Sequence, residues 1–465
     1  MITGPFPGSR MSRVVSRRRF LQSSFAAAAW CALPRFVGSK GRPPNILFIL
    51  ADDLGYGDLS CYGRPDYRTP QLDRLAREGV RFTSNYTAAA VCTPTRVALM
   101  TGRYPARLPI GLVEPLRYGD ESVGLPPEHP TPASLLKRAG YETALIGKWH
   151  LGYLPEHGPI RHGFDEFYGI LSGGVDYFSH RDPGGKLDLH EGNVTVDEAG
   201  YMTDLLTDRA VQYLRRRHAG PFYLALHYTA PHWPWEGPGD TAASRRYRTV
   251  ADTVKRRFVN GYADGGSPRV FAAMVQRLDE GVARVLGALE DAGQSRDTFV
   301  VFTSDNGGER YSYNWPASES KVSLYEGGIR VPAIVRWPGR LPAGRTIDQT
   351  IITMDWTATM LALGGTGADS RYPLDGIDLL PLCQGRPVQF DRTLFWRTLT
   401  QEAARRGAWK YLSFGKDKLL FDIPTDPGER ADLAAYQPEK LAQLAEDFRR
   451  WDAQMLPRPA ATAGN

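Results

Sequence analysis

Two hydrophobic patterns alternate along most of the chain. Residues 45–50 form a continuous apolar run, typical of a strand buried on both faces, and Leu72, Leu75 and Ala76 then follow at helical spacing. Strand and helix in alternation predict an α/β fold with a mostly parallel central sheet and helices on both faces. We expect further buried strands at residues 143–146, 222–227, 299–303 and 333–336, and helices at 134–139, 205–216, 271–292 and 356–363.

The pattern changes past about residue 376. Short candidate strands at residues 394–396, 409–414 and 418–422 follow one another closely, which is typical of an antiparallel sheet. An amphipathic helix is expected at residues 438–451. We therefore expect a leader over residues 1–43, a main domain over 44–376, a smaller C-terminal α+β subdomain with an antiparallel sheet over 377–457, and a disordered tail over 458–465.

Polar side chains collect where the predicted parallel strands end. These ends meet at one edge of a sheet, where α/β proteins bind ligands. Each motif has a structural alternative, since an Asp pair often forms a turn or helix cap, Asp-Asn-Gly-Gly is a turn sequence, and a lone His between proline residues is more often structural. Their recurrence at separate strand ends favours a site made of Asp52, Asp53, Lys148, His150, His232, Asp305 and Asn306.

The carboxylates in this set predict a cation. Asp52, Asp53 and Asp305 would repel one another at close range unless a positive charge lies between them. Carboxylate oxygens together with the Asn306 amide suit Ca²⁺ or Mg²⁺. Zinc is disfavoured, because the sequence has neither paired histidines nor paired cysteines at zinc-ligand spacing.

Cys92 opens a segment with its own chemistry. Pro94 fits the first turn of a helix, which places Cys92 at or just before a helix N-terminus. Free backbone amides and the helix dipole favour an anion there, and Arg96 adds a donor that can make two hydrogen bonds. Without the residues that follow, a buried helix-capping cysteine would be the favoured interpretation.

The wider segment resembles a known family. Cys-Thr-Pro-Thr-Arg at residues 92–96, followed by Leu-Met-Thr-Gly-Arg at 99–103, is similar to the signature of type I, formylglycine-dependent sulfatases such as arylsulfatase A, in the alkaline phosphatase superfamily. Residues 140–150 resemble the second signature of that family. The resemblance extends in order over nearly the whole chain after the leader, through the Asp pair, residues 230–232, residues 304–307, and Lys321 ahead of Tyr-Glu-Gly-Gly at 325–328.

This resemblance implies a modified nucleophile. Cys92 would be oxidised to formylglycine (3-oxoalanine), whose hydrated aldehyde has two hydroxyls. One would attack sulfur, and the other would later expel sulfate from a formylglycine-sulfate intermediate. The implied metal is Ca²⁺, with Mg²⁺ as the alternative, held by Asp52, Asp53, Asp305, Asn306 and an oxygen of modified Cys92.

The resemblance also assigns the remaining roles. A base must take the proton of the attacking hydroxyl, and cations must meet the sulfate oxygens where charge develops. The implied assignments are Asp305 as base, Arg96 and His150 orienting the hydrate, Lys148 and Lys321 on the sulfate oxygens, and His232 at the leaving alcohol, which it would protonate or hydrogen-bond.

The excess positive charge of the chain belongs to its leader. The formal net charge is +6, but eight Lys and Arg residues fall within residues 1–42, which contain no Asp or Glu. The rest of the chain has 49 basic and 51 acidic residues, so nucleic acid is not an expected partner.

The leader predicts export. Ser-Arg-Arg-Arg-Phe-Leu at residues 16–21, ahead of a short apolar run at 25–33, resembles a bacterial twin-arginine signal read by the Tat translocon. A membrane anchor or a disordered basic tail is the alternative, although the run is short for a bilayer span. Cys31 is a candidate for lipid attachment, but Trp30 before it fits the sequence requirement of that modification poorly. We expect a soluble periplasmic or secreted protein.

The expected activity is hydrolysis of sulfate monoesters on a sulfated small molecule or glycan. Because the Tat pathway carries folded proteins, a formylglycine-generating enzyme would modify Cys92 before export. A phosphonate or phosphate ester hydrolase of the same superfold is one alternative, and a non-catalytic, calcium-stabilised glycan-binding protein is another. Cys61 and Cys383 are expected to be small buried residues, with a disulfide between them as the alternative.

Overall fold

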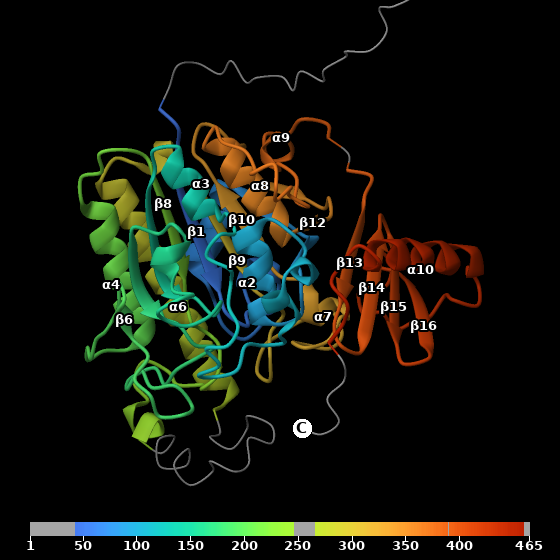
Figure 1. Cartoon of the computed structure of the whole chain (residues 1–465), viewed down its shortest axis with the longest axis horizontal. Coiled ribbons are helices and arrows are strands. Elements are labelled where there is room, and N and C mark those ends of the chain that lie inside the picture. The colour runs from blue at the N-terminus through green and yellow to red at the C-terminus, as the bar shows by residue number, and fades with distance from the viewer. Residues whose placement is uncertain (1–41, 246–265, 389, 460–465) are drawn as a thin grey trace, which may run out of the picture. The chain divides into compact units, whose positions relative to one another are not determined.

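A ten-stranded sheet organises the main body of the protein (Figure 1). This computed structural model describes residues 42–245, 266–388 and 390–459. The strand order is β11-β2-β10-β9-β1-β8-β4-β5-β6-β7. The central parallel strands are β9 (Thr298–Ser304), β1 (Asn45–Ala51), β8 (Phe222–His227), β4 (Glu142–Lys148) and β5 (Glu166–Ile170).

The two edges of the sheet depart from the parallel arrangement. On one side β10 runs antiparallel to both β9 and β2, while on the other β6 runs antiparallel to β5. The expected strand at residues 333–336 is therefore present, but with the direction opposite to its neighbours. The edge strands are β2 (Val80–Phe82), β10 (Ala333–Arg336), β11 (Arg345–Ile347), β6 (His190–Glu191) and β7 (Val194–Thr195), and β3 (Asn85–Tyr86) pairs separately with β12 (Ile351–Ile352).

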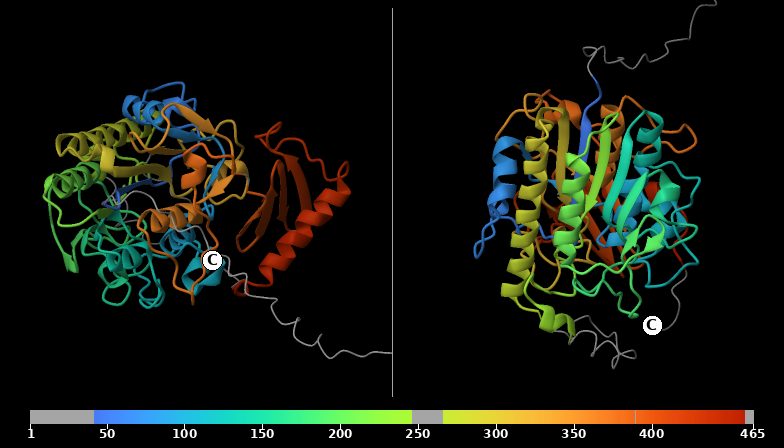
Figure 2. Two further views of the ribbon diagram at one scale, coloured as in Figure 1. Left: turned by 90° about the horizontal axis from the view of Figure 1, so that it is seen from above. Right: turned by 90° about the vertical axis from the view of Figure 1, so that its left-hand side faces the viewer.

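Helices cover both faces of the sheet, as the alternating pattern predicted (Figure 2). Along β1, Leu47 and Ile49 belong to one hydrophobic core, and Ile46 and Phe48 belong to the other, because successive side chains of a strand point to opposite faces. The first core is covered by α1 (Pro70–Glu78), α4 (Met202–Arg215) and α6 (Pro268–Asp291), and the second by α2 (Cys92–Thr101), α3 (Pro132–Arg138), α8 (Thr353–Leu363) and α9 (Leu380–Cys383).

A four-stranded antiparallel sheet follows near the C-terminus. It consists of β13 (Thr393–Arg397), β14 (Gln401–Arg406), β15 (Trp409–Phe414) and β16 (Asp417–Asp422), and α10 (Pro438–Asp452) packs against it (Figure 2). A third hydrophobic core joins this sheet to the main body through residues such as Tyr86 and Trp396. The division at residue 376 stays a prediction, and the described residues on its two sides share this third core.

Cys61 and Cys383 do not form a disulfide. Cys61 packs on one face of the large sheet and Cys383 on the other, so they do not approach each other, and both are free thiols. No helix among the described residues is long and apolar enough to cross a membrane. The twin-arginine motif, Cys31 and residues 460–465 of the expected tail lie outside the described residues.

Candidate active site

Two neighbouring strands deliver the acidic residues to one point. In the β1–β9 pair Ala51 lies opposite Ser304, so the residues that follow each strand emerge side by side. The Asp53 amide donates to Asp305 Oδ1 (3.2 Å), and Asn306 Nδ2 donates to Asp53 Oδ1 (2.6 Å). Asp53 has a left-handed φ of 63°, which turns the chain sharply after Asp52. The side chains of Asp52, Asp53, Asp305 and Asn306 are almost fully buried.

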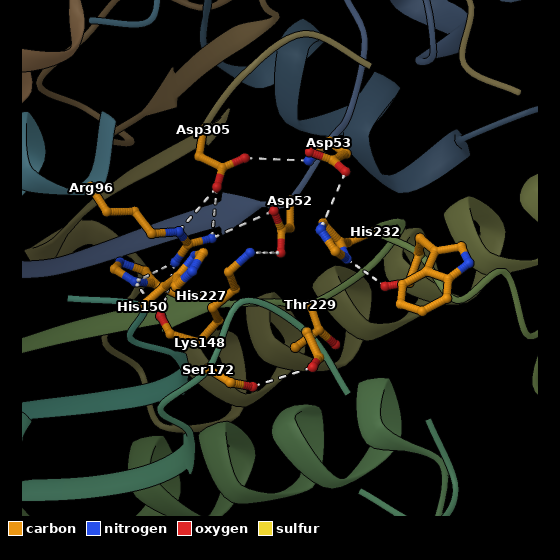
Figure 3. A network of polar contacts seen from close by, with 12 residues as sticks. Asp52, Asp53, Arg96, Lys148, His150, Ser172, His227, Thr229, His232 and Asp305 are labelled. Carbon is orange, nitrogen blue, oxygen red and sulfur yellow. Dashed lines mark hydrogen bonds and ion pairs between the residues drawn. The ribbon is translucent and has the colours of Figure 1, made fainter. Parts of the chain in front are cut away.

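Strands β8 and β4, on the other side of β1, bring two of the basic groups, Lys148 and His232 (Figure 3), and a loop brings the third. Lys148 ends β4 and donates from Nζ to Asp52 Oδ2 (2.6 Å), although the lysine side chain is wholly buried. His232 follows β8, and its Nε2 lies 3.6 Å from Asp53 Oδ2. Lys321 reaches Asp53 Oδ2 from a loop after β9, with Nζ at 2.7 Å.

Cys92 lies at the start of helix α2, where the sequence placed it. The preceding residue, Val91, gives no side-chain cap, so the first backbone amides of the helix remain available to an anion. The ligand atoms of Cys92, Asp52, Asp53 and His232 all lie within 4.8 Å of one another. Burial raises the pKa of the Cys92 thiol to about 12, so the unmodified side chain is protonated at neutral pH and is a poor nucleophile.

Arg96 lies one helical turn after Cys92 and contacts the ends of two strands. Its Nε and Nη2 lie 3.0 and 2.9 Å from Asp305 Oδ2, and its Nη1 donates to the Lys148 carbonyl (2.9 Å). The guanidinium is 1% exposed, so these contacts are not weakened by solvent. Arg96 thereby fixes the ends of β4 and β9 relative to helix α2.

The charges in this site alter one another. Burial alone would raise the pKa of Asp53, but the charges of Lys321, His232 and Lys148 outweigh it and hold that pKa well below its usual range. Burial and the charge of Asp52 raise the pKa of Asp305 to about 6, against the effect of Arg96 and Lys148. The two carboxyls therefore differ in proton affinity.

The oxygen ligands that the site offers fit a hard cation. Asp52 Oδ1 and Asn306 Oδ1 are buried and accept no hydrogen bond from the part of the chain that the structure describes. Buried oxygens without a donor are costly, and a divalent ion would satisfy them. Carboxylate and amide oxygens favour Ca²⁺ or Mg²⁺ over zinc.

Two buried histidines next to the site contact backbone carbonyls. His150 has a left-handed φ of 56°, and its Nε2 lies 3.1 Å from the Leu116 carbonyl. His227, which the sequence reasoning did not single out, ends β8 with Nδ1 3.2 Å from the Lys148 carbonyl. A carbonyl only accepts, so His227 Nδ1 carries the hydrogen, and its 3.5 Å approach to Arg96 Nη1 is not a hydrogen bond. The position of His227 at the end of a predicted strand could have marked it as a site residue.

Asp58 is a second residue that the sequence reasoning missed. Its buried carboxylate accepts from the amides of Gly55 and Tyr313 (both 2.7 Å), from Ser312 Oγ and from Arg64 (2.7 Å). It thus ties the loop after Asp53 to the loop after Asn306. The two loops lie so close together that a Cβ on Gly55 would lie 2.2 Å from Ser312 Oγ.

We expect Asp58→Ala to lower the free energy of unfolding by about 3–5 kcal/mol, because it leaves three donors without their acceptor and takes from the buried Arg64 one of its two carboxylate partners. Urea denaturation measures this loss. Asp66→Ala is the matched control, since Asp66 binds the same Arg64 but is 51% exposed, and its loss should stay within about 1 kcal/mol. Equal losses in the two variants would contradict this role of Asp58.

Comparison with known proteins gives a consistent result. The sulfatase family model matches residues 44–366, and the model described as N-sulphoglucosamine sulphohydrolase, C-terminal, matches residues 319–451. N-acetylgalactosamine-6-sulfatase of Canis lupus familiaris is 33% identical over 88% of this chain and 85% of its own length. Arylsulfatase A of Homo sapiens is 34% identical over 87% of this chain and 82% of its own length.

A solved structure agrees over the same length. The crystal structure of Ps i-CgsB in complex with k-i-k-neocarrahexaose superposes with a TM-score of 0.79 at 30% identity, and covers 90% of this chain and 94% of that one. The alkaline phosphatase-like sulfatase fold expected from the sequence is confirmed. Sulfatases of this family act through a metal and a formylglycine, and the buried cluster of Asp52, Asp53, Cys92 and His232 fits both. The chain belongs to the sulfatase family and is a sulfuric ester hydrolase.

Proposed function

We propose that this enzyme removes sulfate from sulfated carbohydrates, using a formylglycine made from Cys92. The convergence of Cys92 with Asp52 and Asp53 within 4.8 Å carries the proposal, because it places the nucleophile beside the residues suited to a cation. A formylglycine hydrate carries two hydroxyls on one carbon. One forms the sulfate ester, and collapse of the other to the aldehyde releases inorganic sulfate, a route that a simple alcohol lacks.

The residues around Cys92 supply orientation and proton transfer. Asp305 accepts the proton of the attacking hydroxyl, and Arg96, which lies on Asp305 Oδ2, holds that carboxylate in place. His150 orients the hydrate. Lys148 contacts Asp52 and Lys321 contacts Asp53, and the two provide positive charge to the sulfate oxygens as charge develops on them.

Asp52, Asp53, Asp305 and Asn306 would hold Ca²⁺, with Mg²⁺ as the alternative. The bound ion would supply charge neutralisation among the carboxylates and polarise a sulfate oxygen. The residues themselves already provide the oxygens without donors that such an ion needs, at Asp52 Oδ1 and Asn306 Oδ1.

Calcium added to chelator-treated protein should raise the melting temperature. Binding to the native state alone stabilises it by about 2.7 kcal/mol at a hundredfold excess over the dissociation constant. Differential scanning fluorimetry measures the shift. Asn306→Ala should reduce the shift strongly, whereas Asn314→Ala, on the loop nearby, should retain it. An unchanged shift in Asn306→Ala would contradict the proposed ligand set.

His232 is proposed to contact the leaving oxygen. Its Nδ1 donates to the Trp233 carbonyl, so Nε2 is the atom that faces the site. Burial lowers the pKa of His232 to about 3, against the charge of Asp53, so protonation of Nε2 needs further negative charge such as that of the substrate.

We expect His232→Ala to lower kcat/KM for sulfates of poor leaving groups by about 10²–10⁴-fold, and for nitrophenyl sulfate far less. The reason is that nitrophenolate leaves without a proton, whereas a sugar alcohol does not. Steady-state rates on both substrates measure the difference. Equal losses on the two substrates would remove His232 from the acid role.

The carbohydrate assignment is supported by the relatives, two of which are named for or bound to sugars. The expected export agrees with it, since external polysaccharide is met outside the cell. We extend the proposal to maturation by a formylglycine-generating enzyme, passage through the Tat translocon, and a periplasmic or secreted location.

Rates on a panel of sulfated mono- and oligosaccharides test the proposed function. An aryl sulfate serves as the general substrate, and an aryl phosphonate ester serves as the competing chemistry. We expect sulfate release from at least one sugar at a higher kcat/KM than from the aryl sulfate. A preference for the phosphonate ester would contradict the proposal.

A further inference from the structure

The loop that carries Lys321 has an unfavourable backbone conformation. Within residues 318–325, Glu319 has a φ of 63° and Val322 a φ of 79°. Left-handed φ values are disfavoured for residues with a Cβ, and most of all for a β-branched residue such as valine. A conformation of this kind persists only where the surrounding structure holds it.

The main domain holds the middle of this loop. The Lys321 amide donates to the Gly308 carbonyl (3.1 Å), and the Val322 amide donates to the Ala90 carbonyl (2.8 Å). Gly308 follows Asp305 and Asn306, and Ala90 precedes Cys92. The loop therefore lies between the metal-ligand segment and the nucleophile segment, with Lys321 Nζ on Asp53 Oδ2.

The C-terminal subdomain holds both ends. Gln401 at the start of β14 accepts from the Leu324 amide (2.8 Å), and Glu429 accepts from the Glu326 amide through Oε2. Ser318 Oγ donates to the Gly428 carbonyl. The Lys321 loop is thus fastened at three points to residues far later in the chain.

Glu326 and Glu429, which form one of these contacts, also belong to a buried ion cluster. Lys410 on β15 is 0% exposed, and its Nζ lies 3.0 Å from Glu326 Oε1 and 2.8 Å from Glu429 Oε1. Glu326 begins helix α7 (Glu326–Ile329), five residues after Lys321, and is also 0% exposed. The Lys410 ammonium therefore joins the carboxylate of Glu326, which directly follows the Lys321 loop, to the carboxylate of Glu429 in the C-terminal subdomain.

We propose that Lys410 is a positioning residue for catalysis, which acts through Glu326 to set the place of the Lys321 ammonium. This inference rests on the proposed role of Lys321 at the sulfate oxygens. A loop held in an unfavourable conformation relaxes when its anchors are weakened, and small displacements of a charged group at a reacting centre cost large factors in rate. Through Lys410, the C-terminal sheet thereby helps to position the Lys321 ammonium.

Lys410→Met keeps the length of the side chain and removes its charge. We expect it to lower kcat/KM for nitrophenyl sulfate at least about tenfold in protein that remains folded. Gln401→Ala is the second variant, since it removes the acceptor of Leu324 without leaving a buried charge unpaired, and it should lower kcat/KM a few fold. Lys418→Met, an exposed lysine on the neighbouring strand β16, is the matched control and should match wild type.

A double-mutant cycle distinguishes positioning from general destabilisation. In a Lys321→Ala background, Lys410→Met and Gln401→Ala should change kcat/KM by less than about twofold, because the group that they position is gone. Losses of the same size in both backgrounds would overturn the proposal. If Lys410→Met does not fold, the Gln401→Ala cycle decides by the same criterion.

Hydrogen exchange gives a readout that does not depend on turnover. Amides of residues 318–325 should exchange faster in Lys410→Met and Gln401→Ala than in wild type or Lys418→Met. If the wild-type enzyme does not cleave sulfates, the proposed function fails, while this exchange difference still tests the link from Lys410 to the loop. Unchanged exchange in this segment in both variants would overturn it.

Discussion

Cys92→Ala is expected to abolish turnover of aryl and sugar sulfates, with a loss in kcat of at least about 10⁴-fold. The variant removes the carbon that would carry the hydrate, and no other nucleophilic side chain joins Asp52, Asp53 and His232 in the described metal-ligand cluster. Rates on nitrophenyl sulfate measure the loss. Cys92→Ser should react slowly and once, because its sulfate ester has no second hydroxyl to expel sulfate.

Cys383→Ala is the control for the loss of a buried thiol. Cys383 is 0% exposed and packs in the core on one face of the large sheet, away from the acidic residues. It should retain wild-type kcat while losing some stability from the small cavity that it leaves. Comparable losses of activity in both alanine variants would indicate that the effect of Cys92→Ala arises from unfolding.

Arg96→Met should lose activity and stability together. The guanidinium binds Asp305 Oδ2 and the Lys148 carbonyl, so its removal leaves Asp305 without its main partner and frees the end of β4. We expect kcat/KM to fall about 10²–10³-fold. The free energy of unfolding should fall by about 3–5 kcal/mol, since a buried carboxylate would lose its ion pair.

Activity assays and urea denaturation measure the two losses. Arg103→Met is the matched control in the same signature, because Arg103 lies beyond the end of α2 and packs near the ring of Tyr372. It should retain activity within about threefold and lose little stability. An Arg96→Met enzyme with wild-type kcat/KM would contradict the proposed support of Asp305.

The buried parallel strands were predictable because their apolar runs are continuous. β1, β4, β8 and β9 were each found within two residues of their ends. β14 was missed, since Gln-Glu-Ala-Ala-Arg-Arg contains no β-branched or aromatic residue and its register comes from pairing with β13 and β15. The antiparallel direction of β10 was missed as well, because apolar content does not encode strand direction.

The site residues were placed by strand ends and by short motifs. Asp52, Asp53, Asp305 and Asn306 follow strands that are neighbours in the sheet, which made their meeting predictable. Asp58 and the Lys410–Glu326–Glu429 cluster were not predictable in this way. They act through contacts between segments far apart in the chain, and a charged residue in a sequence looks the same whether it is exposed or buried in an ion pair.

The chemical state of residue 92 is the most direct test of the mechanism. The enzyme is prepared with and without a formylglycine-generating enzyme. Mass spectrometry of tryptic peptide 82–96 gives the fraction of modified Cys92 in each preparation, and steady-state assays give its kcat. We predict that kcat rises in proportion to the fraction of peptide in which aldehyde has replaced the thiol, and is zero when that fraction is zero. Full activity in enzyme whose Cys92 is an unmodified thiol would contradict the account.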